Sequence, residues 1–155
     1  MPSTDPAYAV QKGVYTALTT HADMVAAFTT WSDGTVRVYD RVPSDTATGK
    51  ITAKFPYLTI GEDQIIGQTN QNTDLSEVFV KVEVWSRPVT GSKLEVKAIA
   101  GAVRTALARD FDLSGFGIGG FEHHNTMFRR EPDGITERAI VTIRLIVGPS
   151  WSLTY

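Results

Sequence analysis

The sequence predicts an α+β fold: a mostly antiparallel sheet of about four strands, with two main helices packed on one face. Three observations support this fold class. A strand-like alternation is strongest over residues 77–86, an apolar helical pattern follows it, and two strands around a tight turn come near the end. The 155 residues are enough to bury the core of one domain, so we expect residues 1–155 to form a single domain.

The N-terminal segment has the pattern of a helix. Asp5 and Pro6 are favourable residues at a helix start. Apolar residues then recur at helical spacing, at Ala7, Val10, Val14, Ala17 and Leu18. Thr20 and Asp23 have the spacing of a capping box, which predicts a second, short helix. The residues that we expect this helix to bury are Met24, Val25 and Phe28.

Polar loops and short strands are predicted for the next part of the chain. Residues 36–43 form a short extended piece, and residues 55–63 ("FPYLTIGED") resemble a strand. That strand should begin at Pro56 or lie at a sheet edge, because proline has no amide donor. Residues 44–54 and 67–76 are polar and contain turn-forming residues, so we predict two mobile loops there.

Strict alternation marks the most strongly predicted strand, in "EVFVKVEVWS". The residues on one face are Val78, Val80, Val82 and Val84, and those on the other are Phe79, Lys81, Glu83 and Trp85. Ser92 and Glu95 form a second capping box ahead of a helix that should run to about Arg109. Its apolar face comprises Ile99, Ala102, Val103, Ala106 and Leu107.

Two further strands are predicted to form a hairpin. "FEHHNTMF" and "RAIVTIRLIV" flank Pro132, Asp133 and Gly134, a combination that suits a tight turn. One face of the second strand is wholly apolar: Ala139, Val141, Ile143, Leu145 and Val147. The other face consists of Ile140, Thr142, Arg144 and Ile146. This second face is too apolar for open water, so we expect another protein to cover it.

Residues 115–124, "GFGIGGFEHH", contain a GxGxxG spacing followed by Glu122, His123 and His124. A phosphate-binding loop needs a strand before the glycines and a helix after them, and the predicted order is the reverse. We therefore interpret the glycines as a flexible connection into the next strand. Neighbouring strand residues point to opposite faces, so His123 and His124 cannot easily bind one ion. Glu122 and His124 share a face, which leaves open a weak or intersubunit metal site.

Composition excludes several classes of protein. The chain has 15 Lys and Arg against 17 Asp and Glu, which gives a formal net charge of −2 and disfavours tight nucleic-acid binding. It has no cysteine, so disulfides and thiolate metal sites are excluded. No apolar run approaches the roughly 20 residues needed to span a bilayer, and the first residues lack the pattern of a signal peptide.

The aromatic tail, residues 148–155 ("GPSWSLTY"), either packs on its own domain or contacts a partner. Aromatic residues are enriched at the centres of protein interfaces. The residues predicted to form protein interfaces are Phe79, Trp85, Arg129, Arg130, Ile140, Ile146, Trp151 and Tyr155.

Several of these stretches, taken in order, resemble the phage tail-completion family, which is typified by tail-to-head joining proteins of long-tailed phages. The resemblance rests on "VYDRVP", "FPYLTIGED", "VEVWSR", a helix ending in "AVRTAL" and "EPDGITERAIVTIRLI". It extends from about Ala7 to Val147. Residues 44–54 and the segment after Gly148 depart from the family pattern.

The resemblance implies a tail terminator, which is a structural virion protein without catalytic, cofactor-binding or metal-binding residues. Six copies would form a ring that caps the tail tube and meets the neck protein of the head, while DNA passes through the lumen without specific binding. The chain would be made in the cytoplasm of the host bacterium and become part of the tail of a phage or gene-transfer agent. The alternatives are another head–tail connector or tail tube protein of similar fold, or a small hydrolytic or ligand-binding domain using Glu122 and His124.

Overall fold

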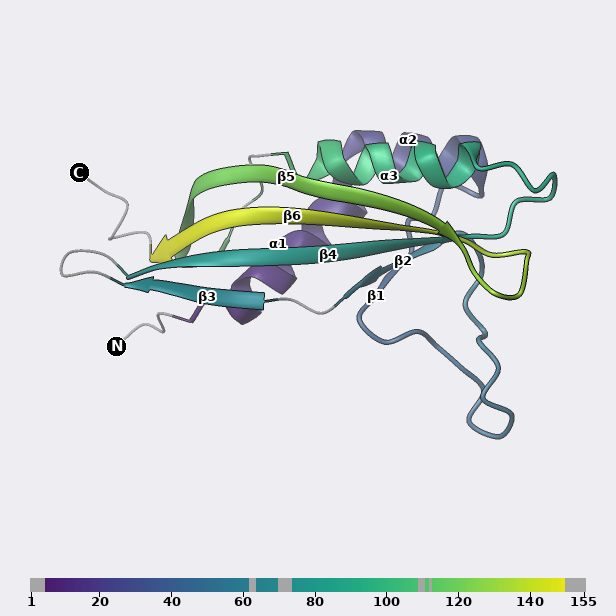
Figure 1. The fold of residues 1–155 in the computed structure, drawn as a ribbon, viewed down its shortest axis with the longest axis horizontal. Helices are drawn as coiled ribbons and strands as arrows, with labels where there is room; N and C mark the ends of the chain where they lie inside the picture. The colour runs from purple at the N-terminus through teal and green to yellow at the C-terminus, as the bar shows by residue number, and fades with distance from the viewer. Residues whose placement is uncertain (1–4, 62–63, 70–73, 109–110, 112, 150–155) are drawn as a thin grey trace.

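A computed structural model of the chain describes residues 5–61, 64–69, 74–108, 111 and 113–149. This part of the chain forms three helices and a six-stranded, mostly antiparallel sheet, which confirms the α+β class with more strands than the predicted four (Figure 1). The elements are α1 (Ala7–Thr20), α2 (Ala22–Trp31), β1 (Val38–Tyr39), β2 (Tyr57–Ile60), β3 (Gln64–Thr69), β4 (Asp74–Ser86), α3 (Leu94–Ala106), β5 (Phe116–Arg130) and β6 (Glu137–Pro149).

The sheet has the strand order β1-β2-β4-β6-β5, and β3 pairs with the remaining length of β4. The pairing of β1 with β2 is parallel, and the other pairs are antiparallel. The long strands β4 and β6 form the middle of the sheet, paired from Ser76–Val147 to Ser86–Glu137. Among the described strands, β5 pairs only with β6, so it forms one edge of the sheet and β1 forms the opposite edge.

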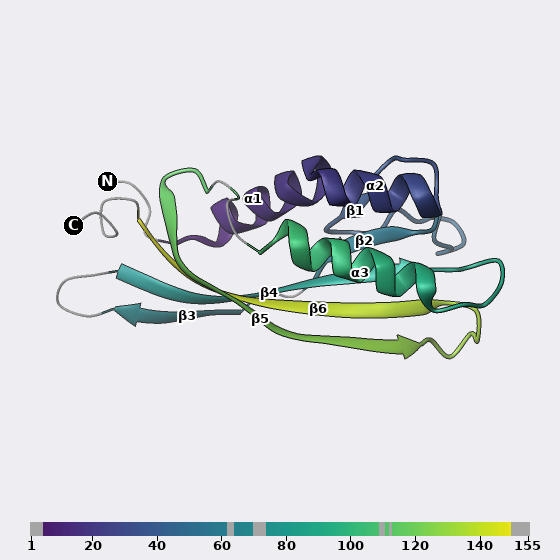
Figure 2. The same cartoon turned by 90° about the horizontal axis from the view of Figure 1, so that it is seen from above.

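The three helices lie on one face of the sheet (Figure 2). The predicted apolar faces of β4 and β6 are confirmed, because the alternating valines of β4 and their counterparts from Ala139 to Val147 are at most 1% exposed. Ile99 and Val103 of α3 pack with them in the core, and burying one such side chain contributes roughly 1.5–3 kcal/mol. Within the described residues, every helix is too short or too polar to cross a lipid bilayer.

α1 begins one residue later than predicted, with Pro6 and not Asp5 as its N-cap, and the predicted cap of α2 is wrong. Asp5 accepts a hydrogen bond from the backbone nitrogen of Ala7 at 2.9 Å. The hydroxyl of Thr20 instead donates to the Thr16 carbonyl within α1, at 2.7 Å. His21 takes the capping position, where its Nδ1 accepts from the backbone nitrogen of Asp23 at 3.1 Å.

The predicted burial of Val25 in α2 is also wrong, because Val25 is 39% exposed. Met24 and Phe28 are fully buried and lie one helical turn apart. Residue 25 is rotated by about 100° from residue 24 on a helix, so its side chain points away from the core.

The capping box predicted for α3 is only half formed. Ser92 Oγ accepts from the backbone nitrogen of Leu94 at 3.1 Å. Glu95 instead accepts a hydrogen bond from the Ser86 hydroxyl, and both residues are buried. This pair ties the end of β4 to the first turn of α3. The helix ends at Ala106, before the predicted Arg109, which lies outside the described residues.

The predicted loop over residues 67–76 is wrong at both of its ends. Gly67 pairs with Ser76 and Thr69 pairs with Asp74, so β3 and β4 form a hairpin. The ladder satisfies backbone donors and acceptors whatever the side chains are, which overrides the polar composition. Residues 70–73 lie outside the described part of the chain.

Residues 44–54 form a small turn structure. Ser44 bridges Ile51, and the backbone nitrogen of Asp45 donates to the Lys50 carbonyl at 2.7 Å. The following strand, β2, begins directly after Pro56, which was one of the two predicted alternatives. The other alternative, an edge position, is wrong because β2 lies between β1 and β4.

Most of residues 115–124 belong to β5. The interpretation of their glycines as a flexible connection is therefore wrong for all but the first of these residues. Gly115 has a φ of +78° in the turn before the strand. Gly117 and Gly120 lie inside β5, which has register irregularities between Ile118 and Gly120 and between His123 and Asn125. The β5–β6 hairpin is confirmed, with Gly134 at a φ of +74°.

Candidate assembly interface

The candidate site is the face of β4 and β6 opposite the helices, which we call the open face (Figure 2). Because side chains alternate along a strand, it consists of the residues between the buried valines of β4 and between the buried residues of β6. These residues are Glu77, Phe79, Lys81, Glu83 and Trp85 from β4, and Arg138, Ile140, Thr142, Arg144 and Ile146 from β6. On this face of β6, each of the two arginines is therefore flanked by uncharged residues.

Arg144 is the centre of one group of ion pairs on the open face. Its Nε lies 2.8 Å from Glu77 Oε2, and its Nη1 lies 3.5 Å from Glu122 Oε2. The Arg144 and Glu77 side chains are both partly buried. The cation is thus matched by carboxylates of the same chain, which leaves little of its charge for a phosphate group.

A second group of ion pairs surrounds Arg138. This guanidinium pairs with Glu83, and its Nη1 lies 3.6 Å from Glu131 Oε1. Arg138 also lies over the ring of Trp85, at 4.7 Å from the ring centre, and a contact of this kind is worth roughly 0.5–2 kcal/mol. The open face is therefore polar but internally neutralised at this end as well.

Trp85, a predicted interface residue, is half-buried against its own chain. Its indole nitrogen donates to Thr59 Oγ1 at 3.0 Å, and its ring stacks on Tyr57 with the ring centres 6.2 Å apart. These contacts fix the orientation of the ring, and its remaining surface is available on the open face.

The other apolar residues of the open face that were predicted to form an interface lie close to β5. Phe79 meets the ring of His124 edge-on at 5.4 Å between centres. Ile146 lies beside Gly120, where a Cβ atom would approach Ile146 Cγ1 to 3.2 Å. Ile140 pairs across the sheet with Met127, which is 53% exposed. The structure therefore brings Phe79, Ile140 and Ile146 to one face, each of them half-buried.

Arg129 and Arg130, two of the predicted interface residues, lie at the end of β5, and carboxylates of the same chain neutralise part of their charge. Arg130 Nε donates to Glu137 Oε1 at 2.6 Å, and Arg129 Nε lies 3.7 Å from Glu131 Oε1. Both arginines are exposed. Trp151 and Tyr155, the remaining predicted interface residues, lie outside the described residues.

The two histidines of β5 have different surroundings. His123 Nε2 lies 2.7 Å from Thr126 Oγ1, and burial, with Arg104 and His124 nearby, lowers the pKa of His123. His124 instead contacts Phe79 on the open face. Within the described residues, no three side chains of the metal-binding types come together. The geometry therefore gives no support to the metal site that the sequence left open.

The loops at one end of the sheet are joined by Arg87, which the sequence did not single out. Its guanidinium lies 4.3 Å from the centre of the Phe55 ring, and its Nε donates to Thr136 Oγ1 at 2.9 Å. Its Nη2 is 3.5 Å from Asp133 Oδ2. Hydrogen bonds from the Thr136 side chain and from the backbone of Ile135 and Thr136 lower the pKa of Asp133 to about 2.

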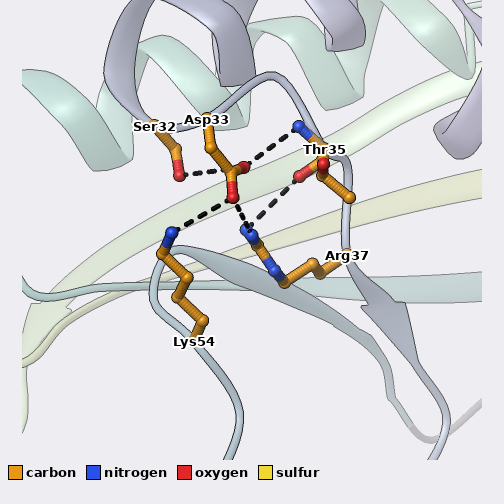
Figure 3. A network of polar contacts seen from close by, with 5 residues as sticks. All are labelled: Ser32, Asp33, Thr35, Arg37 and Lys54. Carbon is orange, nitrogen blue, oxygen red and sulfur yellow. Dashed lines mark hydrogen bonds and ion pairs between the residues drawn. The ribbon is translucent and has the colours of Figure 1, made fainter.

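The same end of the fold holds the loop of residues 44–54 through Asp33 (Figure 3). Asp33 forms ion pairs with Arg37 and with Lys54, whose Nζ lies 3.1 Å away, and it accepts from the backbone nitrogen of Thr35 at 3.1 Å. The hydrogen bond from the Thr35 backbone, followed by those from Lys54 and Arg37, holds the pKa of the Asp33 carboxyl well below its usual range. Arg37, which precedes the loop, and Lys54, its last residue, are thus tied to one carboxylate after the end of α2.

Sequence reasoning missed the ion pairs because they join positions far apart along the chain. Arg144 and Glu77 are 67 residues apart, and Arg138 and Glu83 are 55 apart. The only available signal was the charge pattern, with acids on the exposed positions of β4 and arginines on those of β6. Which acid meets which arginine depends on the register, which the sequence does not specify.

Comparisons with known proteins agree with this architecture. The family described as tail completion protein gp17 matches residues 12–148 of the chain. One chain of the virion of a native gene transfer agent particle is similar, with a TM-score of 0.74 and 24% identity over 94% of this chain and 99% of that one. The gp17 protein of bacteriophage SPP1 is also similar, with a TM-score of 0.54 and 18% identity over 90% of this chain and 88% of that one. No curated protein sequence matches the chain.

The family match covers most of the chain and includes β4, β6 and the open face between them. The resemblance found in the sequence is thereby confirmed. The chain belongs to the family of tail completion proteins gp17, which are structural proteins of the virion tail.

Proposed function

We propose that the chain is a tail terminator: six copies form a ring that caps the tail tube and joins it to the neck of the filled head. The observation that carries this proposal is the family match over residues 12–148. Capping requires only that one side of the ring fits the tube end and that the other side does not accept a further ring of tube subunits. The proposed role involves no catalytic step and no cofactor.

A ring of identical subunits needs two different contact patches, because cyclic assembly is heterologous. The open face, with Phe79, Ile140 and Ile146, supplies an apolar patch on the β5–β6 side of the sheet. The opposite edge, where α1 contacts β1, presents the half-exposed Tyr15 beside Asp40. We assign these two regions as the subunit contacts of the ring.

The two ends of the subunit supply surfaces for two different partners. The loop of residues 44–54 and the β3–β4 hairpin lie at opposite ends of the long axis (Figure 1). We propose that one end meets the tail tube protein and the other the neck protein. Hydrogen exchange should therefore slow in residues 44–54 and in β3 when the free protein joins the tail. Unchanged exchange in both segments would contradict this assignment.

Passage of DNA requires a surface that does not hold phosphate strongly. Tight binding depends on unpaired cations that release counterions from the nucleic acid. On the open face and the neighbouring end of β5, cations and carboxylates balance, and most are paired with one another: Lys81, Arg129, Arg138 and Arg144 stand against Glu77, Glu83, Glu122 and Glu131. This balance disfavours DNA binding to the open face, which in the proposed ring is a subunit contact and not the wall of the lumen.

Tube polymerisation in vitro tests the capping role. Tube protein from the same particle should form shorter, capped tubes when this chain is added at substoichiometric amounts. If tube length does not change at a molar excess of the chain, capping is wrong. If the purified chain polymerises by itself into long tubes, it is a tube protein instead.

A further inference from the structure

A pocket of about 370 Å³ lies between α1 and β1, at the edge of the sheet opposite β5. Its lining includes two buried apolar residues of the sheet, Val38 and Ile60. It also includes Tyr8 and Tyr15 of α1, both of which are exposed. A cavity of about 150 Å³ can hold a benzene molecule, so this α1–β1 pocket has room for a large apolar side chain.

Met127 is an exposed apolar side chain on the opposite edge of the sheet. It pairs directly with Ile140 of β6, so its side chain lies on the open face. Met127 is more exposed than the half-buried apolar residues of that face. A methionine side chain adapts to irregular pockets, and its sulfur makes favourable contacts with aromatic rings. The tyrosines of the α1–β1 pocket supply such rings.

The pocket and Met127 lie at the same level of the sheet. Tyr39, which lines the pocket, pairs with Thr59, and the row of register partners continues through Glu83 and Ile140 to Met127. Two subunits that join at one level are related by a rotation without a shift along the strands. A contact of this kind closes into a ring, whereas a contact with a shift would give an open helical filament.

The charges beside the two positions are complementary. Asp40 lines the pocket and is exposed, with a long hydrogen bond of 3.4 Å from Gln11 Nε2. Lys81 is exposed on the open face and forms no ion pair within the described part of the chain. Asp40 is one residue beyond Tyr39, and Lys81 is two residues from Glu83 towards the same end of the sheet. The levels of the two charges therefore differ by one residue, about 3.4 Å.

We propose that the α1–β1 pocket receives Met127 of the neighbouring subunit and that Asp40 pairs with Lys81 of that same neighbour. This assignment rests on the proposed ring and specifies its contact: the α1–β1 edge of one subunit packs on the open face of the next. The two patches are different, as a cyclic assembly of identical subunits requires. The contact places a free carboxylate against a free cation and buries an exposed methionine among exposed tyrosines.

Charge reversal tests the ion pair in particles from a strain in which the variant replaces the wild-type gene. Asp40→Lys and Lys81→Glu each bring like charges together, so each should reduce the fraction of particles with tails of uniform length at least fivefold. The double variant should restore at least half of the wild-type fraction. Lys93→Glu is the control, since Lys93 is exposed before α3 and lies in neither patch. Single variants without effect, or a double variant no better than the single ones, would overturn the pairing.

Cysteine cross-linking tests the contact itself, because the natural chain has no cysteine. Gln11 lines the pocket, and Asn125 is exposed on the open face two residues before Met127. The variant Gln11→Cys/Asn125→Cys leaves Met127 and both charges intact. Particles that contain it, treated with a short bismaleimide, should give a ladder of covalent products that extends to the proposed six chains. The matched control is Thr30→Cys/Asn125→Cys, since Thr30 is exposed on α2 and does not line the pocket.

We expect at least tenfold more cross-linked product from the pocket pair than from the control pair, and Met127→Asp in the pocket pair should reduce the yield to that of the control. Equal yields in particles that contain the chain and have tails of uniform length would overturn this contact and leave the capping role standing. If the chain is absent from the particles, the proposed function fails as well. The two failures are therefore distinguishable in the same preparation.

Discussion

The guanidinium carbon of Arg87 lies 4.3 Å from the centre of the Phe55 ring. Through its hydrogen bond to Thr136, the same side chain joins the end of the loop of residues 44–54 to the β5–β6 hairpin. A cation–π contact at an exposed site is worth about 0.5–1 kcal/mol, and a hydrogen bond about 0.5–1.5 kcal/mol. Arg87 is therefore the residue that we expect to set the relative positions of the loops at this end.

Arg87→Ala should lower the free energy of unfolding by about 1–2.5 kcal/mol, the sum of these two contributions. Hydrogen exchange should speed up in residues 131–136, because the hairpin loses its contact with Phe55. Lys81→Ala is the control, since Lys81 is exposed on the neighbouring part of β4. Equal stability of the two variants would show that Arg87 does not join the loops.

Ile140→Lys should abolish ring formation while the subunit stays folded. Ile140 is half-buried on the open face, so a lysine there removes apolar contact area and places a charge in the proposed subunit contact. We expect at least a tenfold loss of capping activity in the tube assay, with a cooperative thermal transition retained. Thr30→Asp on exposed α2 is the control and should cap normally. Full capping by Ile140→Lys would exclude the open face as a subunit contact.

Asp133→Asn should reduce stability at neutral pH, and the difference from the wild type should narrow in acid. The folded-state pKa of Asp133 is about 2, against an ordinary value of 3.8. Its ionised form therefore stabilises the fold fully above about pH 4, and this contribution is lost as the pH falls towards 2. Urea titrations at pH 6 and pH 2.5 measure the two differences. A difference that stays constant with pH would contradict the lowered pKa.

Gly120→Ala should destabilise the protein by about 1 kcal/mol, because its Cβ would press on Ile146 Cγ1 at 3.2 Å. In the background of Ile146→Ala, the same change should cost less, since the obstructing atom is gone. Gly101→Ala is the matched control, for which we expect the opposite change in stability. Gly101 lies inside α3 with no atom within 4 Å of a new Cβ, and the change should stabilise the helix by about 0.5–1 kcal/mol. Additive effects of Gly120→Ala and Ile146→Ala would show that the two positions do not interact.

The parts of the fold that the sequence predicts well are those with a strong repeat. The alternation in β4 and β6 predicts the buried apolar residues of their inner faces, because burial on one side imposes a period of two. The hairpin at Pro132–Gly134 is predicted because its turn depends on local residues alone. The same alternation predicts which residues lie on the open face, the apolar Phe79, Ile140 and Ile146 among them.

The parts that the sequence predicts poorly depend on distant partners. Residues 67–69, the second half of β3, are predicted as loop, since they become strand only by pairing with β4. Gly117 and Gly120 belong to a strand because β6 supplies a ladder for them. The role of Arg87 was missed because Phe55 and Thr136 come from separate parts of the chain. In each case the deciding contact joins residues that no local pattern relates.

Tail length in particles produced without this chain is the most direct measure of the proposed capping role. Electron microscopy of a strain lacking the gene should show tail tubes of irregular length, many longer than normal and without heads. Supplying the wild-type chain should restore tails of uniform length joined to heads. Tails of normal length attached to heads in the absence of the chain would contradict the proposal.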